Sequence, residues 1–247
     1  MSAPTVAAVM LANGRPEMVS RAIKSFLAQT YENKRLLIWD SSPGLTCCDQ
    51  LDHNGVVHVP AMDGGSIGCL RNEANSFWTE YPIIVHWDSD DWSHPNRIAE
   101  QVALLQASGA ECVGYNEMLF WDACAAVEVD LSTEAAIDIG EAWLYRAAVP
   151  NYAVGTSMAY WRDTWKRNQF PDLSEGCDDL EWFNRGVKIE SVSAAGIRTT
   201  GVEIMVAQPT MIASIHGGNT CAKIDATKRE WLRVPEWDAY CRSAMQL

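Results

Sequence analysis

Three carboxylates follow directly after an apolar segment of the sequence. Asp88, Asp90 and Asp91 come immediately after residues 82–87, a run typical of a buried strand. In an open α/β sheet, ligands bind outside the carboxyl ends of the strands. Neighbouring carboxylates repel one another, and a divalent cation that carries diphosphate oxygens relieves this repulsion. An acidic cap for the helix expected near Pro95 is the alternative interpretation, although capping uses only one Asp.

A second acidic pair and a histidine could complete such a site. Asp178 and Asp179 follow a glycine turn and precede a short helical pattern. A transferase that activates a hydroxyl needs a carboxylate base, whereas the alternative interpretation is an acidic first helical turn favoured by the helix dipole. His216 ends the apolar run 211–215 and precedes two glycines, so its imidazole could reach a metal. A lone histidine is also common on surfaces and in cores.

A glycine-rich segment and two tryptophans are candidate substrate contacts. Residues 64–72 combine glycines ahead of a helix with Arg71, which suits close approach of a phosphate. The segment is not Gly-x-Gly-x-x-Gly, and the sequence has no P-loop Gly-Lys-Ser/Thr, so dinucleotide oxidoreductases and P-loop kinases are disfavoured. Trp92 and Trp182 lie beside the two acidic clusters, where an aromatic face could stack on a sugar ring.

The segments that must position these residues alternate between strand and helix patterns. Strands are expected at 5–12, 36–39, 55–60, 82–87 and 211–215, with further strand patterns at 112–115 and 124–129. Helical stripes are expected after Pro16, across 70–77, after Pro95 and across 178–186, and 135–149 fits no single pattern. This alternation predicts an α/β fold with a mixed, mainly parallel sheet flanked by helices and a small antiparallel portion.

Charge and hydropathy limit the partners. The chain has 247 residues and a formal net charge of −13, which disfavours nucleic acid and anionic membrane surfaces as general partners. Residues 1–12 lack the pattern of a signal peptide, and no apolar run approaches the roughly 20 residues that span a bilayer. We therefore expect a cytoplasmic protein with no membrane span.

Taken together, these segments resemble the family 2 glycosyltransferases with the GT-A fold. The resemblance covers most of the chain, and the order and spacing of its pieces are more specific than any single motif. It rests on segments 12–17, 26–31, 37–40, 68–72, 88–92, 178–179 and 216–220. It implies a Rossmann-like GT-A domain over 1–247, with a nucleotide-binding half at 1–110, an acceptor-binding half at 111–222 and a C-terminal helical extension at 223–247.

The family also implies roles for individual residues of this chain. Asp40 matches the Asp that contacts the nucleobase, and Arg71 matches the Arg that reaches the nucleotide. Asp88 and Asp90 match the D-x-D motif, which places Asp88 near the ribose and Asp90 on a divalent metal, Mn²⁺ or Mg²⁺. His216 matches a histidine that completes the coordination of the metal in many members.

The remaining implied roles concern catalysis and substrate contacts. Asp179 matches the general base of the inverting reaction. We expect the nucleotide sugar to be contacted also by Ala12, Asn13, Arg15 and Ser89, and the sugar or acceptor by Trp92, Asp178 and Trp182. The first-strand motif of the family reads Thr-Tyr-Asn-Arg, whereas residues 12–15 read Ala-Asn-Gly-Arg, so the usual aromatic and hydroxyl contacts to the base are missing.

The resemblance implies an inverting, metal-assisted transfer of one sugar from a nucleotide diphosphate sugar to an acceptor hydroxyl. A UDP-sugar is the first expected donor; the acceptor is open, with a modified nucleic-acid base disfavoured by the net charge. Two alternatives stay open. A sugar nucleotidyltransferase uses a similar sheet, although its basic, glycine-rich phosphate loop is absent from 11–17. A non-catalytic, metal-dependent sugar-binding module would also use tryptophans and acidic clusters.

Overall fold

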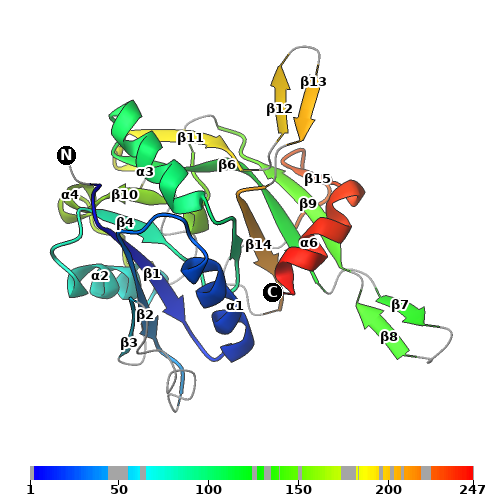
Figure 1. The fold of residues 1–247 in the computed structure, drawn as a ribbon, viewed down its shortest axis with the longest axis horizontal. Helices are drawn as coiled ribbons and strands as arrows, with labels where there is room; N and C mark the ends of the chain where they lie inside the picture. The colour runs from blue at the N-terminus through cyan, green and yellow to red at the C-terminus, as the bar shows by residue number, and fades with distance from the viewer. Residues whose placement is uncertain are drawn as a thin grey trace.

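The structure is a computed structural model of the chain (Figure 1). It describes residues 3–43, 55–61, 65–123, 127–130, 135–138, 140–149, 152–173, 182, 184–194, 197–200, 203–206, 209–217 and 224–246. The helices are α1 (Pro16–Leu27), α2 (Ile67–Phe77), α3 (Arg97–Ser108), α4 (Arg162–Arg167) and α6 (Asp238–Met245), with 3₁₀ turns at Gly155–Ser157 and Pro235–Trp237. No helix in these ranges is long and apolar enough to cross a membrane.

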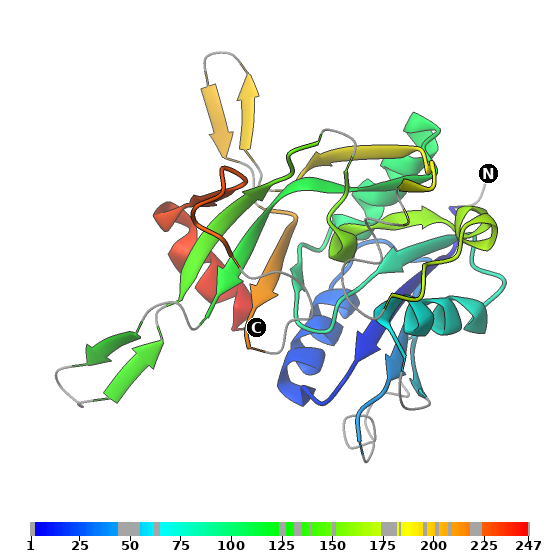
Figure 2. The ribbon, with the colours of Figure 1, turned by 180° about the vertical axis from the view of Figure 1, so that it is seen from behind.

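The strands fall into one large sheet and two hairpins. The large sheet contains β1 (Val6–Ala12), β2 (Lys34–Asp40), β3 (Val56–Pro60), β4 (Ile83–His86), β5 (Trp92–Ser93), β6 (Cys112–Asp122), β9 (Glu141–Arg146), β10 (Ala159–Trp161), β11 (Ile189–Ser193), β14 (Met211–Ile215) and β15 (Trp231–Arg233). The hairpins are β7 (Val127–Asp130) with β8 (Ala135–Asp138), and β12 (Ile197–Thr200) with β13 (Glu203–Val206); both project from the body of the fold in Figures 1 and 2.

The large sheet has a parallel half and a mixed half. Its main order is β15-β9-β6-β10-β4-β1-β2-β3, and β1 pairs in parallel with both β2 and β4. Beyond β4, strand β10 runs antiparallel to β4 and β6, and β9 runs antiparallel to β6 and β15. Strands β11 and β14 add parallel pairs to β6. The predicted fold class, a mainly parallel sheet flanked by helices with an antiparallel portion, is confirmed.

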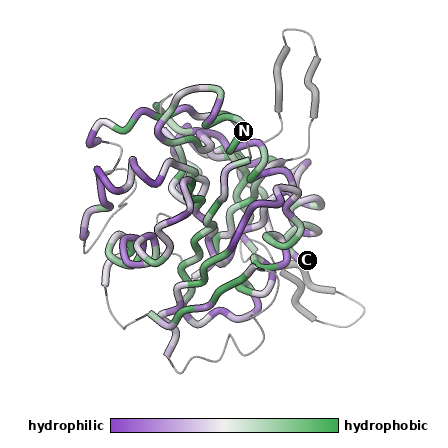
Figure 3. Tube along the Cα trace, turned by 60° about the vertical axis from the view of Figure 1, so that its left-hand side comes forward, coloured by the Kyte–Doolittle hydropathy of each residue, from purple (hydrophilic) through white to green (hydrophobic). Residues whose placement is uncertain are grey.

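The two faces of β1 are covered by different helices. Val6, Ala8 and Met10 pack in one core cluster with the apolar stripes of α1 and α3. Ala7 and Val9 point to the opposite face and pack with α2 and α4. Because side chains alternate along a strand, a strand covered on both faces is apolar throughout, which explains the unbroken run at its sequence position. In Figure 3 the green, hydrophobic colour gathers at the centre of the fold.

The connection between β1 and α1 is short and sharply turned. Gly14 has a φ of 64°, a left-handed conformation that glycine adopts without steric cost. Pro16 then begins the helix, where its fixed φ suits the first turn and its missing N–H is not needed. Arg15, between them, is held at the carboxyl edge of the sheet.

The C-terminal segment adds both a strand and a helix to the fold. Within 223–247, expected to be a helical extension, β15 pairs with β9 and α6 follows it. Helix α6 packs Cys241 and Ala244 against Leu119 of β6 and Leu144 of β9. The strand was missed because three residues, Trp231–Arg233, are too short to show a period in the sequence.

Candidate functional site

Three segments meet at the carboxyl edge of the parallel half of the sheet. Residues 88–91 follow β4, Arg15 follows β1, and His216 follows β14. Strand β14 reaches this edge because it pairs with β5 through Ile212 and Trp92, next to the acidic segment. The fold therefore brings residue 90 against residues that are 75 and 126 positions away in the sequence.

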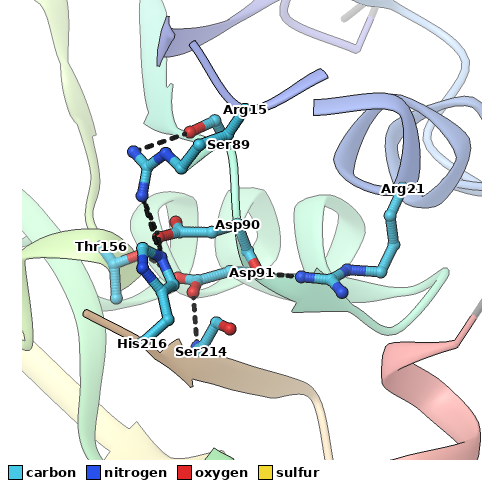
Figure 4. A network of polar contacts seen from close by, with 8 residues as sticks. All are labelled: Arg15, Arg21, Ser89, Asp90, Asp91, Thr156, Ser214 and His216. Atoms are coloured by element: carbon cyan, nitrogen blue, oxygen red, sulfur yellow. Dashed lines mark hydrogen bonds and ion pairs between the residues drawn. The ribbon is translucent and has the colours of Figure 1, made fainter. Parts of the chain in front are cut away.

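Arg15, Asp90 and His216 form a close triangle of polar atoms, seen in Figure 4. Asp90 Oδ2 lies 2.8 Å from His216 Nε2. Arg15 Nη1 lies 3.0 Å from the same carboxylate oxygen and 2.9 Å from the same imidazole nitrogen. The guanidinium is thus the cation that faces both side chains at once.

Only two of the three pairs in this triangle can form a hydrogen bond at the same time, whichever protonation state His216 Nε2 has. If His216 Nε2 carries a proton, it donates to Asp90 and meets the N–H of Arg15 as a second donor. If Nε2 carries none, it accepts from Arg15 and meets the Asp90 carboxylate as a second acceptor. A cation in contact with both acceptors would remove this conflict.

The donor set fits a divalent metal. Asp88, Asp90 and Asp91 each offer a carboxylate oxygen, and these atoms lie within 4.8 Å of one another. Octahedral ligands at about 2.05 Å from an ion are about 2.9 Å from their nearest neighbours. The 2.8 Å between Asp90 Oδ2 and His216 Nε2 is close to that spacing. Carboxylate oxygens suit both Mn²⁺ and Mg²⁺, and an imidazole is a ligand of first-row transition metals.

Asp91 is buried and ties the acidic segment to β14. It accepts a 2.9 Å hydrogen bond from the Ser214 backbone N–H, two residues before His216, and another from the Thr156 hydroxyl. Burial raises the pKa of Asp91 well above its usual value, and the charges of Asp90 and Asp88 raise it further, while the two hydrogen bonds lower it. Asp91 therefore positions the strand that carries His216.

Arg71 extends toward the acidic segment from α2. Its Nη2 is 4.0 Å from Asp88 Oδ1, and its guanidinium lies over the ring of Phe170, 5.7 Å from the centroid. Ser89 Oγ is 3.4 Å from Arg15 Nη2. The sequence gives the carboxylates no basic neighbour, yet the fold supplies two arginines from other segments.

Asp40, at the end of β2, is buried and already holds two hydrogen bonds. Its Oδ1 accepts from the Ser42 N–H at 2.8 Å, and its Oδ2 is 3.1 Å from His58 Nε2 on β3. Ala12, at the end of β1, accepts from the Ser41 N–H at 2.9 Å. His58 was not singled out in the sequence because it lies in a short strand with no polar motif around it.

The two tryptophans are core residues in the described structure. Trp182 is fully buried and stacks on Phe170, with ring centroids 4.9 Å apart. Trp92 is 8% exposed and packs edge-on against Tyr240. The predicted sugar contacts at these positions stay predictions, because neither ring presents an open face here. Asp178 and Asp179 lie outside the described residues.

Comparison with solved structures identifies the fold. The chain aligns with TarS of S. aureus at 15% identity and a TM-score of 0.56, over 85% of this chain and 37% of that one. It aligns with TarS 1-349 in complex with UDP-GlcNAc at 13% identity and a TM-score of 0.56, over 89% of this chain and 62% of that one. The chain has the GT-A glycosyltransferase fold.

A third glycosyltransferase structure agrees with the first two. The mannosyltransferase PcManGT from Pyrobaculum calidifontis, in complex with GDP-Man and Mn²⁺, aligns at 14% identity and a TM-score of 0.58, over 81% of this chain and 59% of that one. The chain thus spans 37–62% of the length of these structures. No protein-family model matches the sequence, and no curated protein matches it.

Arg21 is a residue of the GT-A site region that the sequence did not reveal. From α1 it donates to the backbone carbonyl of Asp90 and, at 2.8 Å, to the carbonyl of Met245 at the end of α6. Burial lowers the pKa of Arg21, and the charges of Asp91 and Asp90 oppose that effect. In the sequence it reads as an ordinary charged residue on a helix, so its partners became visible only in the fold.

Arg21→Gln is expected to lower the free energy of unfolding by about 1–3 kcal/mol, because two carbonyls lose a charged donor. The measurement is chemical denaturation of the purified chain. Arg35→Gln, at an exposed position of β2, removes the same charge and is expected to change stability by less than about 0.5 kcal/mol. Equal stabilities of the two variants would contradict this assignment.

His86 is buried at the end of β4, two residues before Asp88. Its Nδ1 is 2.7 Å from the Gly155 carbonyl and its Nε2 is 3.1 Å from the Tyr160 hydroxyl. Burial lowers the pKa of His86 well below 6.5; Arg71 and Arg97 lower it further, and the Gly155 hydrogen bond opposes them. The folded state therefore holds His86 neutral at pH values where an unfolded histidine is protonated.

The GT-A fold of this chain is accordingly expected to lose stability as the pH falls below about 6.5. The unfolded chain then binds a proton that folded His86 does not, which costs up to about 1.4 kcal/mol per pH unit. Denaturation at pH 7.5, 6.5 and 5.5 measures this slope. In His86→Gln the slope over this window is expected to be smaller than in the wild type. An unchanged slope in the variant would assign the effect to other groups.

Proposed function

We propose that this chain is an inverting glycosyltransferase that moves one sugar from a nucleotide diphosphate sugar to an acceptor hydroxyl. The observation that supports it most is the meeting of Asp88, Asp90 and His216 at the carboxyl edge of a GT-A sheet. TarS 1-349 has been solved in complex with UDP-GlcNAc, and PcManGT in complex with GDP-Man and Mn²⁺. A carboxylate and imidazole cluster on this fold suits a donor whose leaving group is a diphosphate.

The proposed donor site lies along the edge formed by β1, β2 and β4. Arg71 binds the diphosphate side of the donor, which its position 4.0 Å from Asp88 supports. Asp88 binds the ribose, and Ser89 lies beside it. Asp40 acts on the base side, together with Ala12 and Asn13, and Arg15 contacts the nucleotide sugar. A UDP-sugar is the first donor to test.

Asp90 and His216 are proposed to hold a divalent ion, Mn²⁺ or Mg²⁺. Such an ion, when bound, neutralises charge that develops on the diphosphate leaving group. The residues around the pair do the positioning: Arg21 fixes the backbone of Asp90, and Asp91 fixes the strand that ends at His216. Pre-placed ligands need no reorganisation during the reaction, which is the main source of electrostatic catalysis.

Asp179 is proposed as the general base. The acceptor oxygen attacks the anomeric carbon, the bond from that carbon to the diphosphate oxygen breaks, and the acceptor proton passes to the Asp179 carboxylate. One displacement inverts the configuration at the anomeric carbon. Asp178, Trp92 and Trp182 are proposed to shape the sugar and acceptor surroundings.

Calorimetric titration with a panel of nucleoside diphosphates and nucleotide sugars tests this function. We expect one base to bind tightly with Mn²⁺, to bind at least tenfold more weakly in excess chelator, and to lose metal-dependent binding in Asp90→Ala. Failure of the folded chain to bind any member would overturn the proposal in favour of a sugar-binding module. Release of pyrophosphate from a nucleoside triphosphate and a sugar phosphate would instead identify a nucleotidyltransferase.

A further inference from the structure

We propose that Arg15 is a built-in counter-cation of the Asp90–His216 pair, and that Arg15 and a divalent ion exclude one another there. The inference rests on the proposed metal role of this pair, and it concerns competition between Arg15 and the ion for the same two atoms. It assigns to Arg15 control of metal affinity, separate from its proposed contact with the nucleotide sugar.

The geometry of the triangle makes the two occupants incompatible. Arg15 Nη1 approaches Asp90 Oδ2 to 3.0 Å and His216 Nε2 to 2.9 Å, so it faces the same two atoms that an ion would bind. An ion on those atoms would lie within a few ångströms of a guanidinium nitrogen. Like charges at that separation repel strongly in a partly buried site. One cation must therefore leave when the other arrives.

Arg15 is well placed to leave. Its side chain is 30% exposed, and its contact from Nη2 to Ser89 Oγ is long at 3.4 Å. It stands in the connection before α1, directly after the left-handed Gly14. Asp90 stays in position without it, because Arg21 binds the backbone carbonyl of Asp90 independently. Release of Arg15 thus frees the ligand atoms and leaves the backbone of the site intact.

Binding of a nucleoside diphosphate would favour the release of Arg15 from Asp90 and His216. Guanidinium groups bind phosphate through paired, charge-assisted hydrogen bonds, so a diphosphate beside this edge offers Arg15 a replacement partner. When Arg15 binds the diphosphate, its guanidinium no longer contacts Asp90 and His216. Because coupling between two ligands is reciprocal, metal and nucleotide raise one another's affinity through Arg15. The chain takes up the ion chiefly together with its donor.

The test measures Mn²⁺ binding by electron paramagnetic resonance, without any turnover. Arg15→Gln is expected to bind Mn²⁺ about 10- to 100-fold more tightly than the wild type in the absence of nucleotide, the usual weight of a hydrogen bond to a charged group. Arg35→Gln changes the net charge equally at an exposed site and is expected to shift the affinity less than about twofold. Asp90→Asn measures Mn²⁺ bound elsewhere on the acidic surface.

Adding UDP or GDP at saturation completes the test. The wild type is then expected to approach the affinity of Arg15→Gln, so that the difference between them shrinks to a few-fold. Arg15→Lys keeps the charge but lacks the paired N–H donors of a guanidinium, so its Mn²⁺ affinity is expected to lie between those of the wild type and Arg15→Gln. It replaces Arg15→Gln if that variant fails to fold. Tight Mn²⁺ binding that is equal in wild type and Arg15→Gln would overturn the inference while leaving the proposed function intact. Absence of Mn²⁺ binding in every variant, with and without nucleotide, would overturn both.

Discussion

Asp90→Asn is expected to lower kcat/KM for sugar transfer by about two to four orders of magnitude. A bound metal ion stabilises the leaving group by several kcal/mol, which corresponds to a loss of this size. The substitution removes the charge from the oxygen that lies 2.8 Å from His216, and a neutral amide is a poor ligand for a hard cation. The backbone contact from Arg21 to Asp90 remains, so folding should be preserved. Initial rates at saturating Mn²⁺ with the donor found by calorimetry give the comparison.

The control for this prediction is Asp163→Asn. Asp163 is exposed on α4, and its side chain is 79% accessible, so the same change of charge occurs at the surface, where its partner Lys166 is also exposed. Its activity is expected to stay within about twofold of the wild type. If Asp90→Asn retains more than a tenth of the wild-type kcat/KM, the proposed role of Asp90 as a metal ligand is wrong.

Asp179→Asn is expected to reduce kcat by about two to four orders of magnitude with little change in donor affinity. The amide keeps the size of the side chain but accepts no proton from the attacking hydroxyl. Calorimetry on the same sample checks that the donor still binds, which separates loss of the base from loss of the site. Asp172→Asn, an exposed neighbour in sequence, serves as the matched control.

The pH dependence of kcat sharpens this second test. Wild-type activity should fall at acidic pH as the base becomes protonated, and the residual activity of Asp179→Asn should lack that acidic limb. Transfer by Asp179→Asn at a near-normal rate, with the donor bound, would remove Asp179 from the mechanism. An equal loss in Asp172→Asn would point to a structural effect on the whole segment.

Local sequence patterns determined the elements of the parallel half. The apolar run at 5–12 predicted β1, and the residues 82–87 predicted β4, because strands buried on both faces need uninterrupted apolar side chains. Pro16 predicted the start of α1, since its ring presets the first helical turn. The position of the acidic segment directly after β4 followed from the same reasoning.

The mixed half depended on pairings that leave little local trace. Strand β6 extends over Cys112–Asp122, well beyond the expected 112–115, because it pairs with β9, β10, β11 and β14 at once. Partners on both edges support Glu117, which pairs with Arg146 of β9 and Ser193 of β11 and which no strand pattern would include. Long-range hydrogen bonding overrides local preference in such a strand.

The amino-acid sequence alone predicted the fold class and three residue types of the candidate site: clustered carboxylates, a histidine after a strand, and the arginines Arg15 and Arg71. Which charged groups contact one another became visible in the folded chain. The order β4-β1 in the sheet and the pairing of β14 with β5 bring Arg15, Asp90 and His216 within 3.0 Å of one another. Charged groups interact according to their distance in space, and here that distance is fixed by strand pairing across more than a hundred residues. A local sequence pattern therefore could not predict which charged groups meet.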